Sequence, residues 1–467
     1  MQSSDLSEQI YQQRLDRYVA AMRLGQPDRI PIRPFAAEFT ARYAGYTCQQ
    51  VTHDYRRAFD AVIKTCADFD WDAAVPSMIW VWTGLTEAIG LKYYGVPGIH
   101  VEPNVGFQYR EPPEEQAFMR PEDYDEFIAD PTRFAYEVWL PRVAGSVNAR
   151  GEPVSLDHNL SFVRGAMAMS RYFADAGGQV ARMRAETGTV SAISGMLKAP
   201  LDVLADKFRG YVGLAMDLQT RPEKVLAACE ALQRELLHVA LSGLDPECKI
   251  PIPIWMHRTS VPFISYEHFD TIHWPTLKPM VEEIWRHGNQ VLFYAEGQWD
   301  GHLERFAELP KGSIIFHLDR TDPHRAKEVL GGHFALSGGI PNVLLGMGSP
   351  ADVRAKCKEI IDLLASDGGY IMDASAIIQN DATPENMRAM TDFTRQYGVY
   401  GDTTTVPEPP APAPPETWRK TRGVCVPWED HAKQLPPISG DPDLVRSIWE
   451  ELDEAAHMYI WHLVLSF

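Results

Sequence analysis

Residues 290–322 read QVLFYAEGQWDGHLERFAELPKGSIIFHLDRTD. This stretch contains two short apolar runs with the length and composition of buried strands, separated by a segment with helical spacing. The first run ends at Tyr294 and Glu296, and the second ends at His317 and Asp319. Side chains two positions apart on a strand share a face, so each pair is expected to point into one cavity at the carboxyl ends of parallel strands. In α/β barrels the chemistry takes place at that end.

The composition limits the class of protein. The chain has 467 residues, with 63 acidic and 44 basic side chains and a net charge of -19, so we expect no nucleic-acid partner and no binding to an anionic membrane. Its six cysteines form no CxxC pair and no framework spacing, which indicates reduced thiols and a cytoplasmic protein. The sequence shows no apolar signal segment and no apolar run long enough for a membrane helix.

An aromatic loop follows another predicted strand. The segment 69–82, FDWDAAVPSMIWVW, reads as a strand and its exit loop. Large apolar side chains most often belong to a core, but Met78, Trp80 and Trp82 are also suited to form a wall for a flat, apolar substrate. We therefore keep these three residues as candidate substrate-binding residues.

Two further predicted strands end in polar residues. The segment 154–162, VSLDHNLSF, reads as a strand that continues into a loop and offers Asn159 as a candidate for substrate binding. A strand ending at Met256 places His257 at its carboxyl end, which makes His257 a candidate catalytic residue.

Three segments carry a resemblance to a known family. The segment 14–32, RLDRYVAAMRLGQPDRIPI, resembles the beginning of the uroporphyrinogen decarboxylase superfamily, where a helix ending in Gly-x-Pro-Asp-Arg-x-Pro leads into the first barrel strand. The segments 195–232 and 252–290 resemble a branch that includes corrinoid-dependent methyltransferases. The resemblance extends over about residues 14–400 and implies a single (β/α)8 barrel of the TIM type.

The boundaries that follow divide the chain into four parts. Residues 1–28 are predicted as an N-terminal helical extension, because apolar positions recur at helical spacing before Gly25. Residues 29–400 are predicted as the barrel, and residues 401–440 as a linker that contains TTTVPEPPAPAPP. Residues 441–467 have the spacing of an amphipathic helix, which would dock either on its own barrel or on another subunit.

The sequence departs from the decarboxylase pattern at two places. Uroporphyrinogen decarboxylases carry a Gln-Ala-Gly-Arg motif after the first strand and an Asp after the second, which together bind the tetrapyrrole. This chain has RPFAAEFTARY at 33–43 and PSMIW at 76–80 instead. A pyrrole cation would have no carboxylate partner there, so porphyrinogen decarboxylation is not expected. Arg33 and Arg42 remain as candidate anion-binding residues.

The resemblance also raises the question of a metal. Methyltransferases of this superfamily bind zinc through a His-x-Cys after one strand and a Cys after the last strand. An alignment on Gly297 places Tyr294 and Glu296 at the first two ligand positions, so no thiolate is retained. Either the metal is absent, or zinc is held by oxygen and nitrogen ligands. The candidates for such a site are Glu296, His317, Asp319 and Asp373, with His257 as a further ligand.

The resemblance implies methyl transfer between a small organic substrate and a corrinoid. The chain lacks the Asp-x-His-x-x-Gly cobalamin-ligand motif, so the methyl-cobalamin would be carried by a separate corrinoid-binding protein. Glu296 with Tyr294 beside it would deprotonate a substrate hydroxyl, or in the reverse direction His317 or a metal would polarise a methyl ether oxygen. The aromatic loop favours an aromatic or sterol-like substrate. In the non-catalytic alternative, Tyr294, Glu296, His317 and Asp319 would form a fully hydrogen-bonded polar network at the mouth of the barrel.

Two other functional classes stay open. A decarboxylase or lyase acting on a different acid would use Arg33 or Arg42 to hold a carboxylate. A non-catalytic subunit would use the barrel and the C-terminal helix to assemble a corrinoid complex. Relatives in the decarboxylase branch are dimers, so this chain is also a candidate to form a homo-oligomer.

Overall fold

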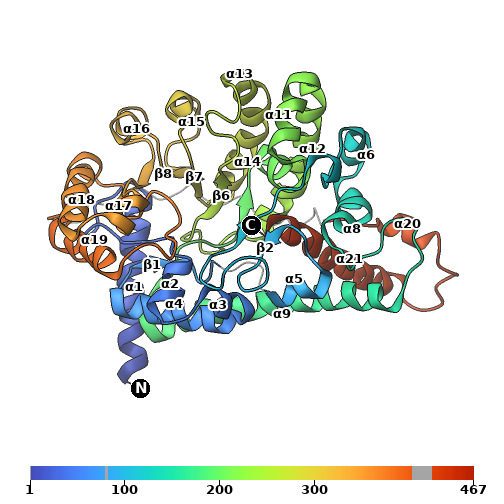
Figure 1. Cartoon of the computed structure of the whole chain (residues 1–467), viewed down its shortest axis with the longest axis horizontal. Helices are drawn as coiled ribbons and strands as arrows, with labels where there is room; N and C mark the ends of the chain where they lie inside the picture. The colour runs from blue at the N-terminus through green and yellow to red at the C-terminus, as the bar shows by residue number, and fades with distance from the viewer. Residues whose placement is uncertain (1, 79–82, 402–422, 467) are drawn as a thin grey trace.

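The computed structural model describes residues 2–78, 83–401 and 423–466. Short parallel strands lie at the centre of the molecule and helices surround them (Figure 1). Six strands form one parallel sheet in the spatial order β10-β9-β8-β7-β6-β5, and β1 pairs with β4 in a second parallel sheet. The strand bounds are β1 Ala73–Ala74, β4 Val190–Ser191, β5 Leu197–Lys198, β6 Ile252–Met256, β7 Val291–Ala295, β8 Ile314–Leu318, β9 Ala335–Gly338 and β10 Tyr370–Ile371.

The residues around Ile32 close these strands into a barrel. Ile32 forms a parallel bridge with Met372 next to β10, and the amide of Arg33 donates to the carbonyl of Met372 at 3.0 Å. On the other side, the amide of Asp72 donates to the carbonyl of Ile32 at 3.0 Å, just before β1. The β4 and β5 strands are two parts of one interrupted strand, because β4 pairs with β1 while β5 pairs with β6. The structure is therefore the single (β/α)8 barrel that the sequence predicted.

The buried side chains of the strands alternate between two apolar layers. Leu292 of β7 and Ile315 of β8 belong to a cluster inside the barrel. Their neighbours Val291, Phe293 and Ile314 belong to the cluster between the strands and the helices. Strands that are buried on both faces are apolar at nearly every position, which is why the two runs in the 290–322 stretch were recognisable.

Helix α1, Gln2–Met22, closes the amino-terminal end of the barrel. Its residues Leu15, Tyr18, Ala21 and Met22 belong to the same interior cluster as the strand residues. The helix that the sequence predicted in this region is thus confirmed, and it forms part of the barrel core.

The remaining helices surround the barrel or extend from it (Figure 1). Two short strands, β2 Tyr94–Gly95 and β3 Gln108–Tyr109, form an antiparallel hairpin among them. The helix bounds are α2 Glu38–Tyr43, α3 Cys48–His53, α4 Tyr55–Phe69, α5 Thr83–Ile89, α6 Tyr124–Ala129, α7 Pro131–Phe134, α8 Leu140–Val143, α9 Leu156–Thr187, α10 Pro200–Val203, α11 Gly210–Thr220, α12 Pro222–Ser242, α13 Tyr266–His268, α14 Trp274–Arg286, α15 Leu303–Phe306, α16 Pro323–Leu330, α17 Asn342–Met347, α18 Pro350–Leu364, α19 Pro384–Tyr397, α20 Trp428–Ala432 and α21 Pro442–Leu465.

The prediction of a strand at 154–162 is wrong, because this segment begins the 32-residue helix α9. Ser155 is the N-cap of that helix, and its side-chain oxygen accepts a hydrogen bond from the amide of His158 at 3.1 Å. A serine at this position satisfies a backbone N–H that the first helical turn leaves without a partner.

The C-terminal helix α21 docks on its own chain through its second half. Ile460, Trp461 and Leu463 are buried against the barrel helices, and the indole N–H of Trp461 donates to the hydroxyl oxygen of Thr132 at 2.9 Å. The first half of α21 exposes Leu452 and other apolar residues to solvent. Of the two docking modes that the sequence left open, the structure shows self-docking. None of the helices in the described ranges is both long and apolar enough to cross a membrane.

Candidate functional site at the barrel mouth

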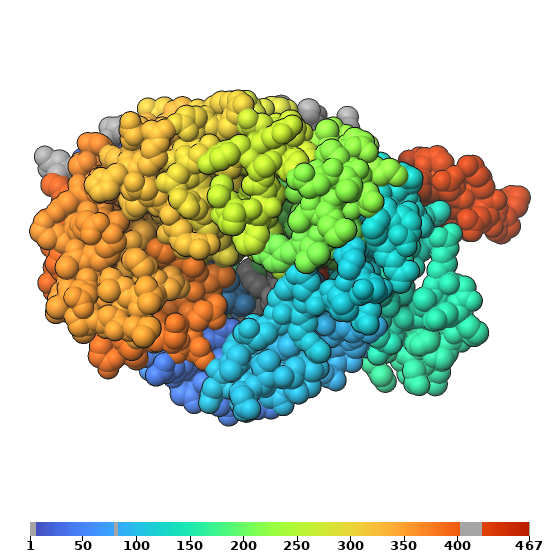
Figure 2. Space-filling model, turned by 45° about the horizontal axis from the view of Figure 1, so that its top comes forward, coloured from blue at the N-terminus to red at the C-terminus, as the bar shows by residue number. Residues whose placement is uncertain are grey.

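A cavity of about 420 Å³ lies at the carboxyl ends of β5, β6 and β7. We call it the mouth cavity. Figure 2 shows a hollow between the yellow-green, orange and cyan parts of the chain, which are the parts that supply many of its lining residues. Most of its wall is aromatic or apolar, and the rest carries ionisable groups. The aromatic residues are Tyr93, Tyr94, Phe107, Tyr109 and Trp255, and the ionisable residues of the polar part are Glu38, Lys198, Asp206, His257, Arg258 and Glu296.

The carboxylate of Asp206 organises the polar part of the mouth cavity. Asp206 lies in a buried π-helical turn, Leu204–Arg209, and forms an ion pair with Lys198 at the end of β5. Its second oxygen lies 2.8 Å from Arg258 Nε and 3.6 Å from His257 Nε2. Burial raises the pKa of Asp206, but the charges of Lys198 and its other cationic neighbours outweigh burial and hold that pKa well below its ordinary value.

A second carboxylate fixes the exit of β6. One oxygen of Asp202, which is buried at the start of α10, accepts hydrogen bonds from the amides of His257 and Arg258 at 2.8 Å. Its other oxygen accepts a hydrogen bond from the hydroxyl of Thr259 at 2.7 Å. The backbone at the end of β6 is therefore held in place, with His257 and Arg258 directed to the mouth cavity.

Glu296 follows β7 and lies at the polar end of the mouth cavity. Burial raises the pKa of its carboxyl group, while His257 and Lys198 oppose the shift. The next residue, Gly297, has a positive φ of 90°, and a Cβ there would collide with the side chain of Ser260. A glycine is therefore required at the turn that presents Glu296.

Arg258 supplies a fixed positive charge to the same cavity. Its guanidinium carbon lies 3.6 Å from the ring centroid of Tyr211 and 4.4 Å from that of Tyr109. Cation–π contacts of this kind favour a charged, oriented guanidinium. The mouth cavity can thus hold an aromatic ring against its apolar wall while a polar group of the ligand meets Glu296, Lys198 or Arg258.

A second polar group lies deeper, inside the barrel. Arg33 Nη2 lies 3.1 Å from Asp373 Oδ2 and donates to the hydroxyl oxygen of Ser337 at 3.1 Å. His317 is hydrogen-bonded to the same hydroxyl through Nδ1 at 3.0 Å and to the carbonyl of Ser375 through Nε2 at 3.0 Å. These side chains are fully or almost fully buried. Burial lowers the pKa of His317 well below its ordinary value, so the imidazole is neutral.

Two of the predicted catalytic residues belong to this interior group. The ring of Tyr294 stacks on that of His317 with centroids 4.3 Å apart, and neither residue lines the mouth cavity. Phe35 and Trp255 pack against Tyr294, with ring centroids 4.8 Å away in both cases. Glu296 and His257 do line the mouth cavity, and their catalytic role stays a prediction.

The predicted metal-binding residues do not form one group. Asp373 pairs with Arg33 inside the barrel, His317 is engaged by Ser337 and Ser375, and Asp319 accepts a hydrogen bond from the amide of Gly297 at 2.7 Å. Across residues 2–78, 83–401 and 423–466, no three His, Cys, Asp or Glu side chains are placed to share a metal ion. Glu296, His317, Asp319 and Asp373 therefore do not fit a tetrahedral zinc site.

The predicted substrate-binding residues do not lie together in the structure. Met78 lines the mouth cavity, while Trp80 and Trp82 lie outside the described residues. Arg33 is enclosed within the barrel, and Asn159 lies on the exposed first turns of α9 because the strand predicted there is a helix.

The other candidate anion-binding residue, Arg42, also lies away from the mouth cavity. It donates to the carbonyl of Asn380 at 2.6 Å and lines a separate cavity with Tyr46 and Cys48.

The sequence analysis did not identify three of the ionisable residues that line the mouth cavity. Lys198, Asp206 and Arg258 come from separate segments and meet only through the fold. The signal available in the sequence was the presence of Lys198, Asp202 and Asp206 within the otherwise apolar segment 195–206. Charged side chains in a segment that is otherwise apolar are expected to be paired when they are buried.

Comparisons with known proteins agree with the fold. Residues 169–397 match the family model described as Uroporphyrinogen decarboxylase (URO-D). Among solved structures, a methyltransferase from Methanosarcina mazei is similar over 82% of this chain and 98% of that chain, with a TM-score of 0.51 and 14% sequence identity. No curated protein matches the chain. The family match over residues 169–397 and the closed barrel both agree with the resemblance to the uroporphyrinogen decarboxylase superfamily.

Proposed function

We propose that this protein is a corrinoid-dependent methyltransferase, which moves a methyl group between a small aromatic or sterol-like substrate and a corrinoid held by a separate protein. The single observation that carries the proposal is an aromatic-walled cavity with a carboxyl group of raised pKa, Glu296, at its polar end. The similar barrel named as a methyltransferase from Methanosarcina mazei supports it further.

The mouth cavity would bind the substrate through its ring. The side chains of Tyr93, Tyr94 and Tyr109 offer aromatic contacts, and Trp255 lies next to Glu296. A ring held against this wall would bring its oxygen substituent to the carboxyl group of Glu296, with Lys198 and His257 close enough to influence that carboxyl electrostatically.

The raised pKa of Glu296 favours its protonated form, which can donate a proton. In its protonated form it would hydrogen-bond to a methyl ether oxygen and transfer the proton as the methyl group leaves, so that the product departs as a neutral hydroxyl compound. The resulting carboxylate would be stabilised by Lys198 and by the neighbouring His257. In the opposite direction the same carboxylate would take the proton of a hydroxyl that becomes methylated. The corrinoid supplies the cobalt that accepts or donates the methyl group.

No step is assigned to zinc, because the candidate ligands lie in two separate groups. Tyr294 and His317 act in this proposal as positioning residues of the barrel interior, since neither lines the mouth cavity.

A decarboxylase or lyase is the second candidate, and one observation favours it. Arg258, clamped between Tyr109 and Tyr211, and Lys198 place positive charges in the mouth cavity, where they would hold a carboxylate. This pair takes the role that the sequence assigned to Arg33 or Arg42.

One substrate can separate the two reactions, because 4-hydroxy-3-methoxybenzoate carries both a methyl ether and a carboxylate. We would incubate it with the protein and reduced cobalamin, and measure methylcobalamin by absorbance and carbon dioxide by trapping. Methyl transfer predicts methylcobalamin with retention of the carboxylate. Carbon dioxide without methylcobalamin would refute methyl transfer in favour of the lyase.

The Glu296→Gln variant tests the acid. We expect it to lower the rate of methylcobalamin formation by about 100-fold or more, since proton transfer by a positioned side chain contributes about that much. Glu38→Gln is the matched comparison, because Glu38 also lines the mouth cavity with a pKa raised by burial. A loss in Glu38→Gln alone would move the acid to Glu38, and an unchanged rate in both variants would refute acid catalysis by either carboxyl group. A wild type that forms no methylcobalamin would favour the non-catalytic scaffold.

A further inference from the structure

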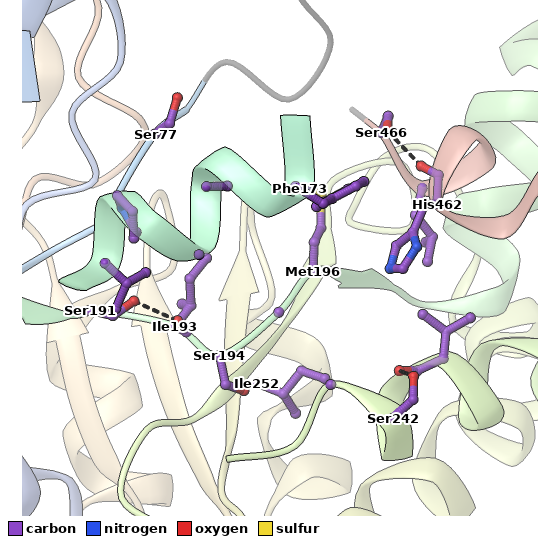
Figure 3. A pocket seen from close by; sticks show the side chains of 18 of the residues that line it. Ser77, Phe173, Ser191, Ile193, Ser194, Met196, Ser242, Ile252, His462 and Ser466 are labelled. Atoms are coloured by element: carbon purple, nitrogen blue, oxygen red, sulfur yellow. Dashed lines mark hydrogen bonds between the residues drawn. The ribbon is translucent and has the colours of Figure 1, made fainter. Parts of the chain in front are cut away.

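A second cavity, of about 390 Å³, lies beside the barrel wall where β4 ends and β5 begins (Figure 3). We call it the lateral pocket. The interrupted strand contributes Ser194 and Met196 to its lining, α9 contributes Phe173 and Gly177, and α21 contributes His462. The C-terminal helix, whose role the sequence left open, thus forms one wall of this pocket.

The wall of the barrel is thin at this place. Between Ser191 and Leu197 the strand changes its pairing partner from β1 to β6. Two small residues, Ser194 and Gly195, lie in the interruption and line the lateral pocket without filling it.

The lateral pocket adjoins the mouth cavity at Met196, which lines both. Ser77 lines the lateral pocket, and the next residue, Met78, lines the mouth cavity. Methionine side chains are unbranched and flexible, so a ligand that spans the two cavities could pass beside them.

The chemistry of the lateral pocket selects an uncharged, apolar ligand. None of its described lining residues is Asp, Glu, Lys or Arg. Burial lowers the pKa of His462 to about 4, so its imidazole is neutral. The hydroxyl of Ser194 is buried without a hydrogen-bond partner among the described residues and offers one polar contact.

We propose that the lateral pocket holds an apolar extension of the substrate whose ring lies in the mouth cavity. The substrate class is therefore a ring compound that carries an alkyl chain or a second apolar ring system. The assignment of the reacting end rests on the proposed function, whereas the binding of the extension does not.

Two adjacent glycines of α9 provide a matched pair of variants. A Cβ added at Gly177 or at Gly178 meets no atom within 4 Å, so a side chain can leave the backbone at both positions without a clash. Gly177 lines the lateral pocket, and Gly178 does not. Both substitutions remove a glycine from the same helix, so they have the same effect on helix propensity. Only Gly177→Leu is expected to occupy the pocket.

The experiment compares the binding of phenol and 4-heptylphenol by isothermal titration calorimetry, without corrinoid and without turnover. Each methylene that leaves water should tighten the Kd about fourfold. We therefore expect 4-heptylphenol to bind the wild type and Gly178→Leu at least about 100-fold more tightly than phenol. In Gly177→Leu that ratio should fall below about tenfold, with the Kd for phenol unchanged. Circular dichroism would verify that both variants are folded.

Several results would overturn the proposal. They are equal affinity ratios in the two glycine variants, a wild type that binds 4-heptylphenol no more tightly than phenol, and a wild type that binds neither compound. Because the titration contains no corrinoid, an intact chain-length effect together with absent methyl transfer would refute the proposed function and leave the lateral pocket supported.

Discussion

One carboxylate, Asp206, balances the buried positive charges of the mouth cavity. Lys198 and Arg258 are at most 4% exposed, and each lies within ion-pair distance of it. We expect Asp206→Asn to lower the free energy of unfolding by about 3–5 kcal/mol, because it leaves buried cations without their counter-charge. Urea unfolding measures this loss. Asp125→Asn is the control, since its ion pair with Lys224 at 2.9 Å lies on the surface and should change nothing measurable. Equal effects of the two substitutions would contradict this account.

A second carboxyl group should make stability depend on pH. Burial raises the pKa of Asp373 from 3.8 to about 7, against the opposing charge of Arg33. The folded protein then binds this proton more tightly than the unfolded chain does. The contribution is therefore fully present below about pH 4 and is lost as the pH rises to about 7. Between pH 5 and pH 8 the wild type should lose stability relative to Asp373→Asn, by on the order of a few kcal/mol. If the unfolding free energies of the wild type and Asp373→Asn changed with pH in parallel, Arg33 would be keeping the Asp373 carboxylate ionised over this whole pH range.

For single residues, the sequence predicted the direction in which a side chain points better than how deeply it is buried. The period of two correctly placed Tyr294 and His317 on the inner face of their strands, and Glu296 beyond the strand end. It could not show that Phe35 and Trp255 would pack over Tyr294, and so leave that side chain outside the mouth cavity. Lateral packing between segments far apart in the chain decides such depth, and a local pattern does not contain it.

Among the elements, α9 shows where local patterns mislead. Val154 and Leu156 alternate with polar residues and suggested a strand, yet Ser155 between them caps a helix. Over so few residues, apolar alternation and the start of an amphipathic helix look alike. The longer apolar runs of β7 and β8 gave no such ambiguity, because the helical segment between them set their limits.

The two halves of α21 should respond differently to truncated side chains. Trp461 is fully buried and hydrogen-bonded to Thr132, so Trp461→Ala is expected to cost about 3–5 kcal/mol of unfolding free energy. Leu452 lies on the same helix with 65% of its surface exposed, and Leu452→Ala should change stability by about 0.5 kcal/mol or less. Thermal and urea unfolding would measure both. Similar small effects of the two variants would mean that α21 does not stabilise the barrel.

For the whole molecule, the resemblance was the main source of the correct fold, because the interrupted strand hides one of the eight barrel strands. Only the pairing of β4 with β1 and of β5 with β6 shows that the residues 190–198 complete the ring. The sequence likewise presented α1 as an extension. Its contribution to the core became visible only when Tyr18 was found among the interior residues.

The closure of the barrel by α1 gives the last prediction. Tyr18 fills the amino-terminal end of the interior, where its hydroxyl donates to the carbonyl of Ala192 at 3.0 Å. Tyr18→Ala should therefore cost about 3–5 kcal/mol, as removal of a buried ring does, while Tyr18→Phe should cost only about 1 kcal/mol for the hydrogen bond. Leu6→Ala changes an exposed residue of the same helix and should be neutral. Urea unfolding of the full-length variants gives this order. If Tyr18→Ala were as mild as Leu6→Ala, α1 would be a dispensable extension and the barrel would close without it.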